Sequence, residues 1–224
     1  MTGEPERDTS QEWLRGLEVF AGPLPEFDPA LAPGDPVRLF VAWLEEAVAD
    51  GVREPHAMTL STVDAAGDPD ARVLILKGVG AAGWQFAAHA LSPKGEQLAG
   101  HPQAALTFYW PELGRQVRVR GSVTSGTAEE SAADFLARSP SARAEALTGR
   151  QSRRVEDTDA GPDGALDKAL ALIEQEPGLV DPAWTRYTLA ATRVEFWQAA
   201  RSRAHTRLRY ERDGEHWQRY RIWS

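Results

Sequence analysis

Sixteen residues near the end of the chain, EFWQAARSRAHTRLRY (195–210), place positive charge at a regular interval. Arginine or histidine occupies every second position from Arg201 to Arg209. Side chains alternate between the two faces of a β-strand, so a strand here would carry four guanidinium groups and one imidazole on one face. The whole chain has a formal net charge of −8 at pH 7. A cationic face on an acidic protein indicates either an edge strand protected from aggregation by charge, or a binding site for an anion.

Other segments offer more groups that could bind an anion. RVLILK (72–77) begins and ends with a cation, and RQSRR (150–154) combines an amide, a hydroxyl and three guanidinium groups. SPKGEQ (92–97) places Lys94 in the first turn of an expected helix, where free N–H groups favour phosphate. Each segment also has an ordinary interpretation: cations that reach water, an exposed lysine, or a basic loop. Gln116 can both donate to and accept from a planar heterocycle. Together these groups predict an aromatic ligand that carries phosphate or carboxylate.

The composition excludes several classes of function. The 224 residues are 42% hydrophobic and 26% charged, as expected of a globular protein with one large domain or two small ones. The chain has no cysteine, which excludes disulfides, zinc–thiolate sites and a cysteine nucleophile. The negative net charge argues against a nucleic-acid partner. The five histidines are scattered without metal-ligand spacing, so no metal site is expected.

Two further patterns bear on cofactor class and location. GVGAAG (78–83) has the spacing of a dinucleotide fingerprint, but a strand pattern follows it where that motif needs a helix, so a hairpin turn is the better interpretation. The first residues, MTGEPERDTSQEW, lack the basic and apolar parts of a signal peptide. No apolar run reaches transmembrane length. We therefore expect a cytoplasmic protein without a membrane partner.

The expected elements must position these groups. A helix is predicted over GDPVRLFVAWLEEAVADG (34–51), with Asp35 as its N-cap and Pro36 in its first turn. After it the apolar residues alternate, which indicates strands and short turns. The expected strands are 57–63, 71–77, 84–90, 103–110 and 115–123, followed by helices near 128–139 and 166–176 and a last set of strands from 184. Residues 1–34 are expected to form a partly disordered arm with a short helix near 13–20, ahead of one domain over 35–224. The fold class is mainly antiparallel β with flanking helices, most simply a barrel.

In this order and approximate spacing, the segments resemble the flavin-dependent pyridoxamine 5′-phosphate oxidase family from about Asp35 to the C-terminus. The resemblance rests on RVLILKG, on SPKGEQLAGHPQAALTFYWPELGRQVRVRG, on GRQS, and on EFWQ followed by R-x-H-x-R-x-R-Y. It implies an FMN-binding split β-barrel whose C-terminal strands take part in dimerisation. It also implies a homodimer with FMN at the interface.

Residue by residue, the resemblance implies that Arg72 and Lys94 hold the FMN phosphate with help from Ser152. Arg203 and His205 would be the catalytic residues facing the substrate over the flavin. The other positions implied to bind FMN are Val73, Lys77, Ala87, Ala88, Gln116, Gln151, Trp197 and Arg207. The positions implied to bind the substrate are Lys77, Arg138, Arg203 and His205.

The activity implied is hydride transfer from a small reduced nitrogen heterocycle to FMN, with dioxygen as the acceptor and hydrogen peroxide as a product. Departures from the family pattern bear on the substrate. Asp134 and Ala142 stand where the family has a tyrosine and a serine that hold the substrate phosphate, and an aspartate there repels phosphate. The segment LEVFAGPLPEFDPALAPGDP (17–36) resembles the arm of the phenazine-biosynthesis flavin oxidases.

These departures favour a dihydrophenazine-type substrate without phosphate, and they predict that Asp134 lies near the substrate site. Lys77 points the other way, because it matches the enzymes that oxidise pyridoxine or pyridoxamine 5′-phosphate to pyridoxal 5′-phosphate, and that activity is the alternative. A split-barrel protein that binds flavin without catalysis is a second alternative, against which the presence of Arg203 and His205 argues.

Overall fold

The computed structural model describes residues 11–155 and 161–224. A nine-stranded antiparallel sheet forms its centre, with the order β2-β1-β5-β6-β7-β4-β3 and with β8 and β9 continuing outward from β7. The strands are β1 (Ala57–Val63), β2 (Pro69–Ile75), β3 (Gly78–Gly80), β4 (Gly83–His89), β5 (Gln103–Trp110), β6 (Arg115–Ser125), β7 (Trp184–Gln198), β8 (Thr206–Asp213) and β9 (His216–Arg221). The expected strands and the hairpin at 78–83 are therefore observed, with bounds shifted by one or two residues.

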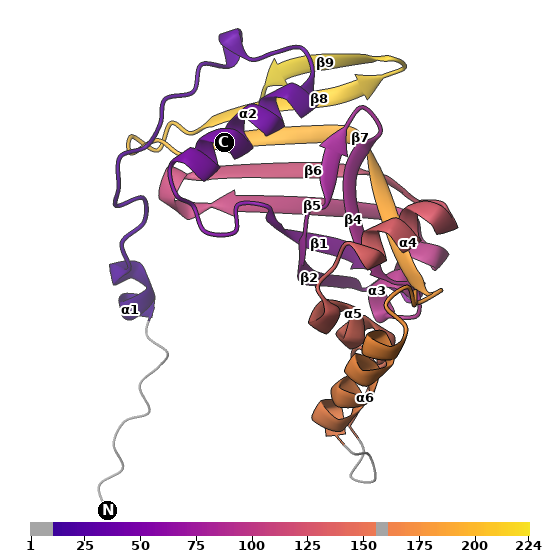
Figure 1. Ribbon diagram of the computed structural model, residues 1–224. Coiled ribbons are helices and arrows are strands. Elements are labelled where there is room, and N and C mark those ends of the chain that lie inside the picture. Colours follow the sequence, from indigo (N-terminus) through magenta and orange to yellow (C-terminus); the bar gives the residue numbers. More distant parts are fainter. Residues whose placement is uncertain (1–10, 156–160) are drawn as a thin grey trace, which may run out of the picture.

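The longest strand, β7, gives the sheet its curvature. It pairs with β6, β4 and β8, and its register with β6 shifts between Arg120 and Gly121. A Cβ atom at Gly121 would overlap the backbone carbonyl of Ala190, so β6 and β7 approach this closely only because this residue is glycine. Such a bulge bends a strand and increases its twist. Figure 1 shows β7 changing direction midway, so that the sheet curls into a half-barrel, in agreement with the expected split barrel.

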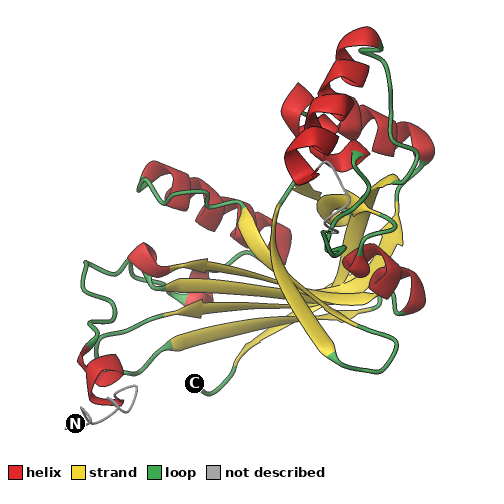
Figure 2. Cartoon of the chain, turned by 90° about the horizontal axis from the view of Figure 1, so that it is seen from below, coloured by secondary structure: helices red, strands yellow, loops and turns green. Residues whose placement is uncertain are grey.

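Helices flank this sheet at two places. The helices are α1 (Gln11–Gly16), α2 (Pro36–Ala49), α3 (Pro93–Gly100), α4 (Ala128–Leu136), α5 (Pro140–Leu147) and α6 (Gly161–Gln175). The Asp35 carboxylate accepts the N–H of Val37 at 2.9 Å, and Thr127 and Glu130 form a capping box at α4. Figures 1 and 2 show α4, α5 and α6 gathered at one end of the sheet, while α2 lies across it elsewhere. None of the described helices combines the length and apolar character needed to cross a membrane.

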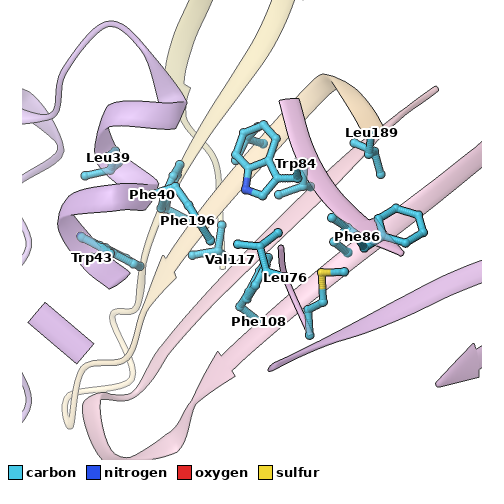
Figure 3. Packing of buried hydrophobic residues seen from close by; sticks show 14 of the residues in the cluster. Leu39, Phe40, Trp43, Leu76, Trp84, Phe86, Phe108, Val117, Leu189 and Phe196 are labelled. Carbon is cyan, nitrogen blue, oxygen red and sulfur yellow. The ribbon is translucent and has the colours of Figure 1, made fainter. Parts of the chain in front are cut away.

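Aromatic residues of α2 fill the space between this helix and the sheet (Figure 3). The Phe40 ring lies 4.8 Å from that of Phe108, and the Trp43 ring lies 5.2 Å from that of Phe196. All four side chains are buried. Burying one large apolar side chain contributes about 1.5–3 kcal/mol, so this cluster holds α2 and the middle strands in a fixed arrangement.

The arm before α2 packs on the loop and strand that follow β7. The guanidinium of Arg201 donates to the carbonyl of Gly22 at 3.0 Å, and the hydroxyl of Tyr210 donates to the carbonyl of Pro33 at 2.6 Å. The short helix expected near 13–20 is observed as α1. The predicted disorder of the arm falls partly on residues 1–10, which lie outside the described residues.

The structure corrects one expectation: residues 195–210 do not form a single strand. β7 ends at Gln198, the chain turns through 199–205, and β8 begins at Thr206. Antiparallel neighbours need such a connection, and the N–H of Arg203 closes this one on the carbonyl of Ala200. Arg203 itself has φ +67°, a left-handed conformation. Of the five cations only Arg207 and Arg209 lie on β8, so the five do not share one strand face.

Candidate active site

Seven of the predicted site residues line one cavity of ≈350 Å³ beside β2, β4 and the first turn of α3. Trp184, His89 and Glu145 complete part of its wall. The strands and helices that supply these residues are far apart in sequence, and the curl of the sheet brings them together. We call the seven residues the cavity group: Val73, Lys77, Ala87, Ala88, Lys94, Arg138 and Gln151.

Lys94 is the buried cation of this group, with 5% of its surface exposed. Its ammonium group donates to two neutral oxygens, the Ser92 hydroxyl at 3.2 Å and the Gln151 amide oxygen at 2.5 Å. Burial, and then the nearby charge of Arg72, lower the pKa of Lys94. A Cβ atom at Gly95 would overlap the carbonyl of Ala90, so glycine allows the tight turn into α3. A buried cation in the first turn of a helix fits a phosphate group.

Arg72 is held at the edge of this region by a small polar network. Its guanidinium donates to the Thr62 hydroxyl at 2.5 Å and to the Gln97 amide oxygen at 3.1 Å, and it forms an ion pair with Asp70. A hydrogen bond from Gln97 is the largest of the effects that lower the pKa of Asp70. The network holds the Arg72 guanidinium where its charge lowers the pKa of Lys94.

A second polar cluster lies where α4 meets the start of β7. The Asp134 carboxylate accepts the indole N–H of Trp184 at 2.8 Å and lies 3.8 Å from the ammonium nitrogen of Lys77. The guanidinium carbon of Arg138 lies 3.9 Å from the centre of the Trp184 ring. Within the described residues, Nη1 of Arg138 is buried without a hydrogen-bond partner, and burial lowers the pKa of this side chain. A buried guanidinium nitrogen beside a cavity is a donor for an anionic ligand.

The remaining predicted residues lie elsewhere. Gln116, Trp197 and Arg207 are direct cross-strand neighbours on β6, β7 and β8. The His205 ring centre lies 5.0 Å from that of Trp197. We call these four residues the strand-end group. Arg203 lies exposed in the turn between β7 and β8, two residues before His205.

The cavity group and the strand-end group are separated along β7. Trp184 in the cavity wall begins this strand, and Trp197 lies thirteen positions later. An extended strand of that length spans on the order of 40 Å, and Figure 1 shows the two ends of β7 far apart despite its bend. A single chain therefore does not bring all the predicted residues to one ligand. Ser152 follows Gln151 in an exposed turn with φ +64°.

Several residues of these sites escaped the sequence interpretation. Thr62 and Trp184 carry no local signal, because their roles depend on partners distant in sequence. Gln97 could have been found, since it lies one helical turn after Lys94. Phe20 was also missed, although its ring lies 5.8 Å from Trp197 and 6.2 Å from His205.

A curled antiparallel sheet with flanking helices defines a split-barrel protein, and cations line its cavity. The chain belongs to the pyridoxamine 5′-phosphate oxidase family, whose model matches residues 44–166. A second model, for the pyridoxine 5′-phosphate oxidase C-terminal dimerisation region, matches residues 184–224. Membership implies FMN as the cofactor and an oxidase activity. The family, the fold class and the cofactor expected from the sequence are thereby confirmed.

Individual relatives bear on the substrate. A pyridoxine/pyridoxamine 5′-phosphate oxidase of Pseudomonas paraeruginosa is 42% identical over 199 residues, which cover 86% of this chain and 90% of the relative. The enzyme of the same name from Thermosynechococcus vestitus is 41% identical over 195 residues, with the same coverage. These relatives support the alternative expected from the sequence better than the phenazine-type interpretation.

Solved structures give a second comparison. PhzG from Burkholderia lata, in complex with tetrahydrophenazine-1-carboxylic acid, superimposes with a TM-score of 0.82 at 30% identity and covers 91% of this chain and 100% of its own. An FMN-binding protein from Nostoc punctiforme, at 19% identity and a TM-score of 0.70, shares the fold.

Proposed function

We propose that the chain is an FMN-dependent oxidase that takes a hydride from a reduced nitrogen heterocycle, with pyridoxine or pyridoxamine 5′-phosphate as the first candidate substrate. The proposal depends most on one observation: the cavity holds the buried Lys94, which donates only to neutral oxygens in its described hydrogen bonds, and the half-buried Arg138, whose buried Nη1 has no described partner. Two cations in one cavity suit one phosphate on the cofactor and one anionic group on the substrate. The names of the relatives at about 40% identity support the choice of substrate.

Within this proposal Lys94 and Arg72 bind the FMN phosphate, with Ser152 as a further donor. Ala87 and Ala88 lie in β4 and offer backbone groups to the flavin. When bound, FMN supplies the hydride acceptor and the reaction with dioxygen that yields hydrogen peroxide. The chain contributes placement of the substrate, exclusion of water and fixed charge.

The proposed active form is a homodimer in which each site draws on both chains. The separation of the two groups along β7 supports this form, as does the match of residues 184–224 to a dimerisation region. The cavity group of one chain then meets the strand-end group of the other. This arrangement accounts for the finding that residues implied to share one site lie far apart along β7.

In this arrangement His205 and Arg203 act on the substrate. The Nδ1 atom of His205 accepts the N–H of Ala200 at 3.0 Å, so the neutral ring carries its proton on Nε2. Nε2 is then the atom that can donate to the substrate or exchange a proton with it. Arg203 orients the substrate through its planar fork of donors.

A second candidate substrate, a phosphate-free heterocycle that carries a carboxylate, is favoured by Asp134. Its carboxylate lies 3.8 Å from Lys77 and opposes a phosphate at that position. The Burkholderia lata neighbour, solved with tetrahydrophenazine-1-carboxylic acid, points to the same class. A carboxylate has less charge than a phosphate and can be held by Arg138 alone.

Oxygen uptake by the FMN-loaded protein separates these candidates. Uptake with peroxide release on adding pyridoxine 5′-phosphate supports the first substrate. Uptake only with a reduced phenazine carboxylate supports the second. A protein that retains FMN but oxidises neither compound would contradict the oxidase proposal and leave flavin binding without catalysis.

A further inference from the structure

Glu195 is a buried carboxylate at the centre of an arginine row on the middle strands. It lies on β7 directly between Arg118 of β6 and Arg209 of β8. Only 5% of the residue is exposed. A buried carboxylate is costly unless it is paired and hydrogen-bonded, so its partners are the key to its role.

The partners of Glu195 come mainly from β8. Oε1 accepts Nε and Nη2 of Arg207 at 3.2 and 2.7 Å, and Oε2 accepts Nη2 of Arg209 at 3.2 Å. Arg118 lies further away, at 3.9 Å. Burial by itself raises the pKa of Glu195, but the hydrogen bonds from the two closer arginines outweigh burial and hold it below its usual value. The carboxylate is therefore charged at neutral pH.

These contacts fix Arg207 almost completely. Besides Glu195, its Nη1 donates to the backbone carbonyl of Trp223 at 2.9 Å. An arginine has five N–H donors, and three are used in these bonds. One hydrogen remains on each terminal nitrogen, in a plane set by Glu195, and Arg207 is the direct cross-strand neighbour of Trp197.

We propose that Glu195 is a positioning residue that orients Arg207 toward the flavin and balances its charge, so that Arg207 acts as a fixed hydrogen-bond donor. This inference rests on the proposed function, because it takes Arg207 as a flavin contact. In this proposal Glu195 acts only through Arg207 and touches neither cofactor nor substrate. It differs from a purely structural ion pair in two measurable ways: it affects FMN affinity, and it affects the reduction potential of bound FMN.

The test uses the full chain and compares Glu195→Gln with Glu211→Gln. Glu211 is a matched control, since it also pairs with a guanidinium on this sheet, that of Arg193 at 2.8 Å, but makes no described contact with Arg207. We expect Glu195→Gln to weaken FMN binding about tenfold, measured by flavin fluorescence. We also expect a more positive reduction potential, because removing a negative charge favours the reduced, anionic flavin. Glu211→Gln should change neither quantity.

A double-mutant cycle with Arg207→Lys gives an independent measurement, also usable if Glu195→Gln folds poorly. Arg207→Lys keeps the charge and loses the two-nitrogen contact, so FMN affinity should fall to a similar extent. The double variant should bind FMN no worse than Arg207→Lys alone, since both changes remove one interaction. Additive losses, or a folded Glu195→Gln protein with unchanged FMN affinity and potential, would overturn the inference. Failure of the wild-type protein to bind FMN would overturn the proposed function along with it.

Discussion

The cavity group and the strand-end group both contain cations, but they treat positive charge differently. Lys94 donates to neutral oxygens, and Nη1 of Arg138 is buried without a partner among the described residues. In the strand-end group, Arg207 is paired with the carboxylate of Glu195. Lys94 and Arg138 of the first group hold charge that a ligand must neutralise, whereas the charge of Arg207 is balanced by the chain itself. The first is therefore suited to anion affinity and the second to orientation.

The largest expected effect is on FMN binding by the cavity group. Lys94→Met should weaken FMN binding about 100-fold, because it removes a charge-assisted contact with phosphate from a buried position. The same change should raise the thermal stability of the FMN-free protein, since it removes the cost of burying a charge. Lys168→Met, at an exposed position of α6, is the control and should leave both measurements unchanged. Equal affinity in both variants would remove Lys94 from the phosphate site.

The lowered pKa of Lys94 makes both the stability of the FMN-free protein and its affinity for FMN depend on pH. The folded FMN-free protein releases this proton at a lower pH than the unfolded chain does. Between the folded pKa and the ordinary lysine value, the unfolded state binds more protons, so stability rises with pH in that window. We expect unfolding titrations to show this rise in the wild type and to lose it in Lys94→Met. FMN affinity should fall over the same pH range, because the cation is lost.

A substitution next to the strand-end group should lower catalysis without changing the affinity for FMN. Arg203→Ala removes an exposed turn residue expected to contact substrate, and kcat/KM should fall roughly 30-fold with FMN affinity unchanged. Arg212→Ala, on the exposed end of β8, is the matched control. A loss of FMN in Arg203→Ala would assign Arg203 to the cofactor.

A smaller effect tests how charge in the cavity selects the substrate. Asp134→Asn frees Lys77 from its ion pair and keeps an acceptor for the Trp184 indole. The ratio of kcat/KM for pyridoxine 5′-phosphate to that for a phenazine carboxylate should rise about tenfold. Asp167→Asn, exposed on α6, should leave the ratio unchanged. A ratio that stays constant in Asp134→Asn would show that this carboxylate does not select against phosphate.

The smallest effect is expected at the margin of the arginine row. Arg118 is largely exposed, and its guanidinium lies 3.9 Å from Glu195. Exposed ion pairs contribute about 0–1 kcal/mol, so Arg118→Ala should change unfolding free energy by less than about 1 kcal/mol and FMN affinity by less than about twofold. A larger loss of affinity would place Arg118 in the site.

Local patterns predicted most elements and several residues that line one cavity. Lys94 and Gln151 lie in short motifs whose neighbours in sequence are also neighbours in space, and both line the cavity. The prediction of a single strand over 195–210 was wrong because alternation cannot distinguish one strand from two strands joined by a turn. Glu195 was overlooked because a single acid in a strand has no meaning until β6 and β8 are paired beside it. Its role depends on register, which one sequence does not reveal.

Because β7 is long, variants of separate chains can test the cavity group and the strand-end group independently. In the proposed two-fold dimer, a chain lacking Lys94 and a chain lacking Arg203 each carry one intact half. When such chains pair, one of the two sites receives both defects and the other receives none. Mixing two poorly active variants should therefore restore about a quarter of wild-type activity, because about half of the dimers form between unlike chains with one sound site in two. Complementation of this kind is impossible if each chain completes its own site.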